Sequence, residues 1–244
     1  MNMVNKIPKV IHYCWFGKKD KPDIVNSCID SWKRVLNDYE IIEWNEDNID
    51  IESNMYIKQA YQSCKFAFVS DYVRLKVLYD YGGIYLDTDV EVFKSFNDLL
   101  ENDSIWGFEE ANYVATSTIG AQKGNELIGE FLDLYKNSIF IDKFGKLNQT
   151  TNVLIITELL YQKGIKMNGE YQQIDKISIY PREYFSPYDY SNCRNFTTEY
   201  TYCIHYFYKS WLPLSQRIKS GIKYKIAKVI GGDNIARIRK IIRF

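Results

Sequence analysis

The sequence has few of the residues that build disulfide-rich or zinc-ribbon folds. Its 244 residues include five cysteines, an odd number without a Cys-x-x-Cys pair, and only two histidines. This pattern disfavours a disulfide framework and a zinc ribbon, and it is typical of a reducing compartment. The five prolines are not gathered into a linker, and no internal repeat or low-complexity segment is visible. We therefore expect a cytoplasmic protein.

Long hydrophobic runs are also absent. No stretch of 18 apolar residues occurs, so the sequence predicts no membrane-spanning helix, and its first 17 residues lack the apolar core of a signal peptide. An excess of charge is missing too, because 31 basic residues balance 31 acidic ones. This balance disfavours a uniformly basic nucleic-acid binder, so we expect no nucleic-acid partner.

The neutral total conceals a basic segment. Residues 216–244 hold nine basic residues and one acid, Asp233, which leaves residues 1–215 with the opposite net charge. Isoleucines recur there at three- and four-residue spacing, with a break at Gly231–Gly232. We predict a domain over 1–215 and a basic amphipathic helical tail over 216–244, which docks on an anionic membrane surface at the inner face of the cell membrane. Packing on the domain and dimerisation remain alternatives.

Hydrophobic residues make up 46% of the chain and charged residues 25%, which is typical of a soluble globular protein with a substantial core. The periodicity predicts an α/β sandwich with a mixed, mainly parallel sheet. We expect residues 111–124, which are rich in small side chains, to form a loop. The main expected strands are 7–16, 39–44 and 84–93, and the expected helices are 24–36, 55–81 with a break near Ser63, 126–136 and 152–162.

Two carboxylates stand out in the expected strand 84–93. Asp87 and Asp89 are two residues apart, which puts both on one face of a strand, roughly 7 Å apart along the backbone. Two carboxylates in an apolar run repel each other and lose hydration, and a divalent cation such as Mg²⁺ or Mn²⁺ relieves both costs. The alternative is that the strand ends at Leu86 and both residues cap a solvated turn.

A second charged pair precedes this strand. Asp71 and Arg74 are three apart in an otherwise apolar helical segment, so they share a face. A buried carboxylate and guanidinium must be paired or hydrogen-bonded. The pair is therefore either a structural salt bridge or a ligand-facing pair.

Together these residues resemble a known family. FVSDYVRLKVLYDYGGIYLDTDVEV resembles the core of DXD-type sugar transferases (glycosyltransferase family 32), which include bacterial capsular-polysaccharide glycosyltransferases and yeast mannosyltransferases. It is also similar to the catalytic domains of clostridial glucosylating toxins. IPKVIHYCWFG, YPREYFSPYDY and TYCIHYFYKSW extend the likeness over residues 7–212. The resemblance implies a GT-A fold, a nucleotide-sugar donor, Mn²⁺ or Mg²⁺, and retention at the anomeric carbon.

The resemblance also implies roles for individual residues. Asp87 lies near the ribose and the metal, Asp89 binds the metal directly, and His205 is a third metal ligand. A core tryptophan at position 15 and a structural histidine at position 205 are the alternatives. On the donor side, Trp15 stacks on the nucleobase, Asp71 and Arg74 contact the donor sugar and its phosphates, and Ser210 and Trp211 close over the diphosphate.

The resulting prediction is a metal-dependent, retaining glycosyltransferase. It moves a sugar from a nucleotide-sugar donor, with a UDP-sugar favoured, to a glycan or lipid-linked glycan acceptor in surface polysaccharide synthesis such as capsule formation. Glu109 and Glu110 are candidate acceptor-side groups. A DxD phosphatase-type hydrolase and a non-catalytic carbohydrate-binding module are the alternatives.

Overall fold

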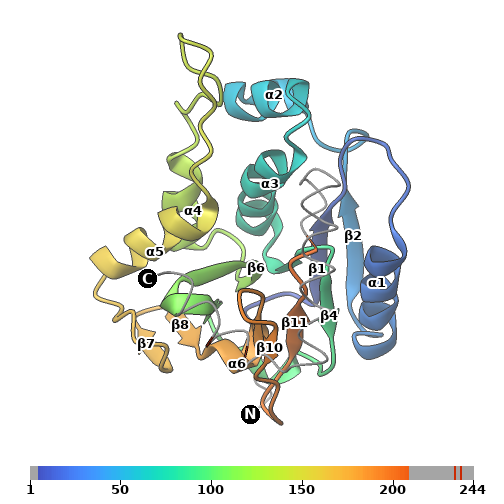
Figure 1. The fold of residues 1–244 in the computed structure, drawn as a ribbon, viewed down its shortest axis with the longest axis vertical. Helices are drawn as coiled ribbons and strands as arrows, with labels where there is room; N and C mark the ends of the chain where they lie inside the picture. Colours follow the sequence, from blue (N-terminus) through green and yellow to red (C-terminus); the bar gives the residue numbers. More distant parts are fainter. Residues whose placement is uncertain (1–4, 209–233, 235–236, 238–244) are drawn as a thin grey trace.

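The computed structural model describes residues 5–208, 234 and 237. These residues form a seven-stranded sheet in the order β2-β1-β3-β6-β5-β8-β7 (Figure 1). Two short two-stranded sheets, β4 with β11 and β9 with β10, lie beside it. The strands are β1 (Val10–Cys14), β2 (Glu40–Trp44), β3 (Gly83–Leu86), β4 (Val90–Val92), β5 (Ser104–Phe108), β6 (Val114–Ala121), β7 (Gln172–Ile174), β8 (Ile177–Tyr180), β9 (Tyr188–Asp189), β10 (Arg194–Asn195) and β11 (Cys203–His205).

Strand direction decides where the site forms. Strands β1, β2 and β3 pair in parallel, β6 runs antiparallel to both β3 and β5, and β8 is parallel to β5. Five strands, β1, β2, β3, β5 and β8, therefore end at the same edge of the sheet. This arrangement confirms the expected α/β class with a mixed, mainly parallel sheet. Ligands in such sheets bind beyond the carboxyl ends of the strands.

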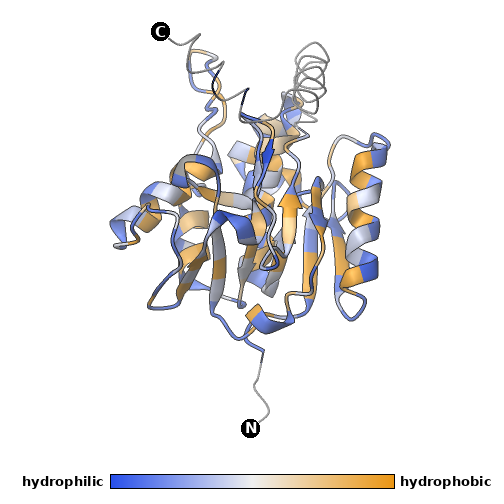
Figure 2. Ribbon diagram, turned by 60° about the horizontal axis from the view of Figure 1, so that its bottom comes forward, coloured by the Kyte–Doolittle hydropathy of each residue, from blue (hydrophilic) through white to orange (hydrophobic). Residues whose placement is uncertain are grey.

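Helices cover both faces of the sheet. Residues of α2, α3, α4 and α5 pack into one hydrophobic core, and α1, α6 and the β4–β11 pair pack into a second core on the other face. In Figure 2 much of the central strands is orange, the colour of hydrophobic residues. No helix among the described residues has the length and hydrophobicity to cross a membrane. The helices are α1 (Asp23–Val35), α2 (Met55–Gln62), α3 (Phe66–Tyr81), α4 (Glu126–Asp133), α5 (Asn152–Gln162) and α6 (Arg182–Phe185).

The long helix expected over 55–81 is divided, as the sequence indicated, just after Ser63. Helix α2 ends at Gln62, and Cys64 adopts a positive φ of 54° before α3 begins. Helix α3 ends at Gly82, whose φ is 68° and whose N–H donates to Leu78 O. A Cβ at Gly82 would lie 2.6 Å from the Lys123 nitrogen, so this sharp entry into β3 requires glycine.

The expected loop at 111–124 is wrong, because β6 occupies most of it. All eight residues of β6 are buried, and the strand lies between β3 and β5 near the middle of the sheet. Small side chains serve packing here: a Cβ at Gly120 would lie 2.5 Å from Ile105 Cγ1. A strand covered on both faces needs no polar alternation, so its sequence does not show the period of two that marks an exposed strand.

The single strand expected over 84–93 is also wrong. Strand β3 ends at Leu86, the chain turns with the Val90 N–H donating to Asp87 O at 3.0 Å, and β4 then pairs with β11 outside the main sheet. Strand β3 lies in the main sheet and β4 in the two-stranded sheet with β11, and the turn connects the two. Asp87 and Asp89 therefore lie on a turn and not on one face of a strand.

Candidate active site

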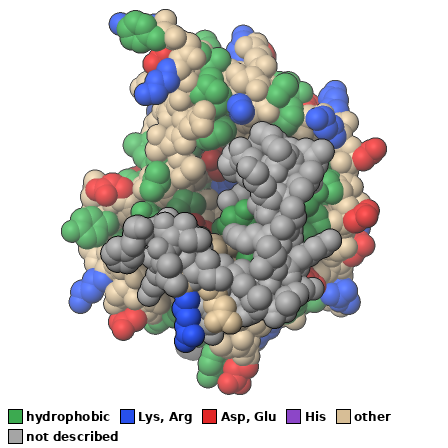
Figure 3. Space-filling model, in the orientation of Figure 1, with side chains coloured by type: hydrophobic (Ala, Val, Ile, Leu, Met, Phe, Trp, Pro, Cys, Tyr) green, Lys and Arg blue, Asp and Glu red, His purple; other side chains and the backbone are tan. Residues whose placement is uncertain are grey.

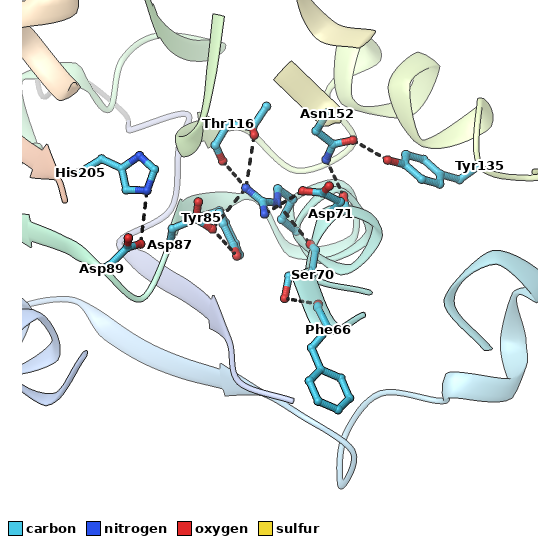
Figure 4. A network of polar contacts seen from close by, with 11 residues as sticks. Phe66, Ser70, Asp71, Tyr85, Asp87, Asp89, Thr116, Tyr135, Asn152 and His205 are labelled. Carbon is cyan, nitrogen blue, oxygen red and sulfur yellow. Dashed lines mark hydrogen bonds and ion pairs between the residues drawn. The ribbon is translucent and has the colours of Figure 1, made fainter. Parts of the chain in front are cut away.

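A buried arginine links the charged groups at the strand edge. Arg74 Nη2 lies 2.9 Å from Asp71 Oδ1, and its Nη1 lies 3.3 Å from Asp87 Oδ1. Nη1 also donates to Thr116 O at 2.6 Å, so helix α3 is tied to β6 as well as to the end of β3. Figure 4 labels the partners of Arg74, namely Asp71, Asp87 and Thr116, which lie around one part of the site. The spacing predicted that Asp71 and Arg74 share a helix face, and they form an ion pair.

The surroundings of Arg74 fix the charges in this network. Its guanidinium lies 4.6 Å from the centroid of the Tyr85 ring, and the Tyr85 hydroxyl donates to Asp87 Oδ1 at 3.0 Å. Burial alone would lower the pKa of Arg74, but the carboxylate of Asp87 reverses this and raises it. Burial raises the pKa of Asp71 to about 6, against the attraction of Arg74. The permanently charged guanidinium of Arg74 thus lies beside the carboxylates of Asp71 and Asp87, which have different surroundings.

The DXD turn meets a histidine from a distant strand. Ligand atoms of Asp87, Asp89 and His205 all lie within 4.8 Å of one another, and all three side chains are partly buried. His205 Nε2 lies 3.3 Å from Asp89 Oδ1, and the other carboxylate oxygen accepts the Tyr208 N–H at 2.7 Å. His205 reaches this point because β11 pairs with β4, with His205 opposite Val90.

This group of side chains fits a divalent cation. Burial alone would raise the pKa of Asp89 and lower that of His205, but their mutual attraction outweighs both effects, so the pKa of Asp89 is lowered and that of His205 raised. The buried Nδ1 of His205 has no hydrogen-bond partner in the described part of the chain. Two carboxylates on one turn and an imidazole from the neighbouring strand are ligands that Mn²⁺ and related divalent ions accept.

The other histidine, His12, lies in the core and faces away from this group. Its Nδ1 accepts the Trp44 Nε1–H at 3.1 Å, so its Nε2 carries the proton that it donates to Gly82 O at 2.7 Å. Burial lowers the pKa of His12, which keeps the ring neutral. His12 therefore joins β1 to the end of α3 and has no role in metal binding.

Trp15 lies at the same strand edge, directly after β1. Its side chain is partly buried, its Nε1–H donates to Lys19 O at 2.7 Å, and Lys21 Nζ lies 5.8 Å from its ring centroid. Trp15 also packs against the second hydrophobic core, so it is held in place while part of its side chain stays accessible. No hydrogen bond or ion pair of the described residues joins Trp15 to the carboxylates. Ser210, Trp211 and residues 216–244, apart from Asn234 and Arg237, lie outside the described residues.

Two further charged residues lie at this edge. Glu109 follows β5 and is within electrostatic reach of His205, Asp87 and Glu110. Arg182 follows β8 and also acts on Glu109. The sequence reasoning named Glu109 as an acceptor-side candidate but missed Arg182. The signal that could have found it is its position directly after a buried strand of the same direction.

Residues 22–106 match the family described as the glycosyltransferase sugar-binding region containing a DXD motif. This segment is therefore similar to the sugar-binding region of DXD-type glycosyltransferases. The matched segment contains four of the charged residues described above, whereas Trp15 and His205 lie on either side of it. These four are Asp71, Arg74, Asp87 and Asp89.

Proteins similar to this chain include an uncharacterized glycosyltransferase of Acanthamoeba polyphaga mimivirus, 25% identical over 85% of this chain and 84% of the relative. Inositol phosphoceramide mannosyltransferase 3 of Schizosaccharomyces pombe is 29% identical over 52% of this chain. The chain spans only 36% of that enzyme's length. Among solved structures, the PaToxG glycosyltransferase superposes with a TM-score of 0.46 and 22% identity, over 64% of this chain and 69% of that one.

Proposed function

We propose that this protein is a glycosyltransferase that uses a divalent cation, Mn²⁺ or Mg²⁺, to transfer a sugar from a nucleotide-sugar donor to a hydroxyl group of an acceptor. The observation that carries the proposal is the convergence of Asp87, Asp89 and His205 within 4.8 Å, inside and beside the matched DXD region. Without a cation, the two carboxylates of the turn have His205 and Arg74 as their ion-pair partners among residues 5–208.

Under this proposal Asp87, Asp89 and His205 hold the cation. A cation held there would supply positive charge to the diphosphate leaving group of the donor. Arg74 adds a fixed positive charge whose position is set before the donor binds, because Asp71 and Thr116 O hold it on two sides. Asp71 accepts hydrogen bonds from the donor sugar, and the Trp15 indole stacks on the nucleobase.

We further propose a UDP-sugar donor, retention at the anomeric carbon, and a glycan or lipid-linked glycan acceptor in surface polysaccharide synthesis. The partly exposed indole of Trp15 supports base stacking, and the name of the yeast relative supports an acceptor carried on a lipid. Figure 3 shows Lys, Arg, Asp and Glu scattered over the described surface of one face, without a basic patch. Peripheral membrane docking therefore rests on the basic sequence of residues 216–244, and residues 1–215 are the proposed catalytic domain.

The test is release of nucleoside diphosphate from UDP-glucose, UDP-galactose and GDP-mannose, measured with Mn²⁺, with Mg²⁺ and with EDTA. We expect release that needs the cation and favours a UDP-sugar. Asp89→Asn should lower this rate more than about tenfold, a loss above about 1.4 kcal/mol in transition-state stabilisation, because it removes the charge that faces His205.

Asp133→Asn is the matched control, since Asp133 is an exposed aspartate at the end of α4. It should keep the full rate. Release that persists in EDTA, or an Asp89→Asn variant as active as the Asp133→Asn control, would show that the proposed metal role is wrong. Release of inorganic phosphate from a phosphomonoester would instead favour a phosphatase.

A further inference from the structure

Glu109 and Arg182 carry opposite charges and lie at the same edge of the sheet without forming an ion pair in the described part of the chain. Strands β5 and β8 are parallel, with Gly107 opposite Tyr180. Glu109 and Arg182 each follow that pair by two residues, so the register brings them to neighbouring positions beyond the sheet. No ion pair or hydrogen bond between these two side chains occurs in the described part of the chain. The two side chains therefore leave each other's hydrogen-bonding capacity unused.

Arg182 has hydrogen-bonding capacity that the described residues do not use. Its Nε and Nη2 are buried and have no hydrogen-bond partner among them. The guanidinium lies 4.9 Å from the centroid of the Phe196 ring, which fixes its plane without satisfying its N–H groups. A buried donor without an acceptor is costly, and a buried cation more so. This side chain is arranged for an acceptor atom that arrives from outside the fold.

The helix that carries Arg182, α6, packs closely against β5. Helix α6 packs on β5 so closely that a Cβ at Gly107 would lie 2.7 Å from the ring of Phe185. Phe185 itself is buried in the second core. The glycine thus lets α6 approach the sheet and sets the position of Arg182 relative to Glu109.

Glu109 is the complementary group. Its carboxylate is partly buried and accepts no hydrogen bond from the described residues, although its backbone N–H donates to Tyr113 O at 2.7 Å. Burial raises the pKa of Glu109; His205 and Arg182 oppose this rise, and Asp87 and Glu110 add to it. These neighbours place the carboxylate beside the proposed metal ligands, on the side of the sheet away from β1 and Trp15.

We propose that Glu109 and Arg182 together bind the hydroxyl groups of a sugar acceptor. An ionised carboxylate only accepts hydrogen bonds and a guanidinium only donates them, whereas a hydroxyl does both. One hydroxyl, or two neighbouring hydroxyls of one sugar, therefore satisfies both side chains at once. This inference rests on the proposed function. It predicts that the acceptor is a polyol and not a simple alcohol.

The experiment compares the variants Glu109→Gln and Arg182→Met with wild type, using Mn²⁺ and the best donor of the panel above. Methyl glycosides of glucose, galactose and mannose serve as acceptors. We expect the KM for the accepted glycoside to rise by about tenfold or more in each variant, because a charged hydrogen bond is lost. The Kd of the donor, measured by calorimetry, should stay within about twofold, because neither side chain contacts the donor.

The matched controls are Glu126→Gln and Arg34→Met, both at exposed helix positions away from the site. They should leave both constants unchanged. Arg182→Lys should restore part of the affinity, since it returns one charged donor. The octyl glycoside of the same sugar distinguishes a lipid-borne acceptor from a free glycan. If the natural acceptor is carried on a lipid, the octyl glycoside should be a better acceptor than the methyl glycoside. The two substitutions should affect both glycosides equally.

Three outcomes would overturn the inference. A glycoside KM unchanged by both substitutions would show that the pair does not contact the acceptor, and a donor Kd weakened as much as the glycoside KM would place it on the donor side. If methanol is accepted and no methyl glycoside is, the proposal that the acceptor is a polyol would be wrong. Should Arg182→Met not fold, the near-isosteric Glu109→Gln decides alone. Wild type that releases no nucleoside diphosphate from any donor refutes the proposed function itself, before any variant is compared.

Discussion

Replacing Arg74 with methionine tests the charge network most directly. The substitution keeps much of the side-chain volume but removes the ion pairs to Asp71 and Asp87 and the hydrogen bond to Thr116 O. Breaking a buried ion pair by removing one partner costs about 3–5 kcal/mol, because the other charge stays buried without compensation. We expect a loss of this size in the free energy of unfolding at pH 7, measured by urea denaturation in EDTA.

The loss should depend on pH in a defined direction. The pKa of Asp71 is already raised to about 6, and removal of Arg74 raises it further. Above pH 6 the folded variant binds a proton that folded wild type does not, so its relative stability falls as the pH rises, by up to about 1.4 kcal/mol per pH unit. Below pH 6 Asp71 is protonated in both folded proteins, and the difference should become flat.

The double variant Asp71→Asn/Arg74→Met isolates the responsible carboxylate. It should be more stable than Arg74→Met alone at pH 8 and should lack the pH dependence between pH 6 and pH 8. Arg34→Met, an exposed change at the end of α1, should alter stability by less than about 0.5 kcal/mol. A loss below about 1 kcal/mol for Arg74→Met, typical of a surface ion pair, would refute the reasoning, as would an unaltered pH dependence in the double variant.

Two further substitutions test other parts of the site. Gly107→Ala should cost about 1–3 kcal/mol in unfolding free energy, since its Cβ would lie 2.7 Å from Phe185, and should raise the KM of the acceptor more than the Kd of the donor; an unchanged melting temperature would contradict this. Trp15→Ala should weaken donor binding by about 1–3 kcal/mol with little change in stability, measured by calorimetry and by thermal denaturation. A loss of stability without weaker binding by the folded protein would identify Trp15 as a core residue.

Local patterns in the sequence predicted the features that depend on neighbouring residues. The i, i+3 spacing indicated the contact between Asp71 and Arg74, and the apolar run followed by two glycines indicated α3 and its end. The clustering of Asp87, Asp89 and His205 came from the family resemblance and not from spacing. The ligand roles of these residues stay predictions.

The features that the sequence did not reveal depend on pairing between distant segments. Strand β6 lacks an alternating pattern because both of its faces are covered, and the turn at Asp87–Asp89 exists because β4 leaves the main sheet to pair with β11. The proximity of Glu109 and Arg182 follows from the register of β5 on β8, which no local spacing encodes.

The pairing of β4 with β11 makes the group of Asp87, Asp89 and His205 depend on the folded chain. The two carboxylates directly precede β4, whereas His205 lies on β11, far along the sequence. Bringing such distant segments together costs conformational entropy, which the hydrogen bonds between β4 and β11 offset. A chain that ends before Cys203 would therefore keep both carboxylates but lack the imidazole that lies beside them.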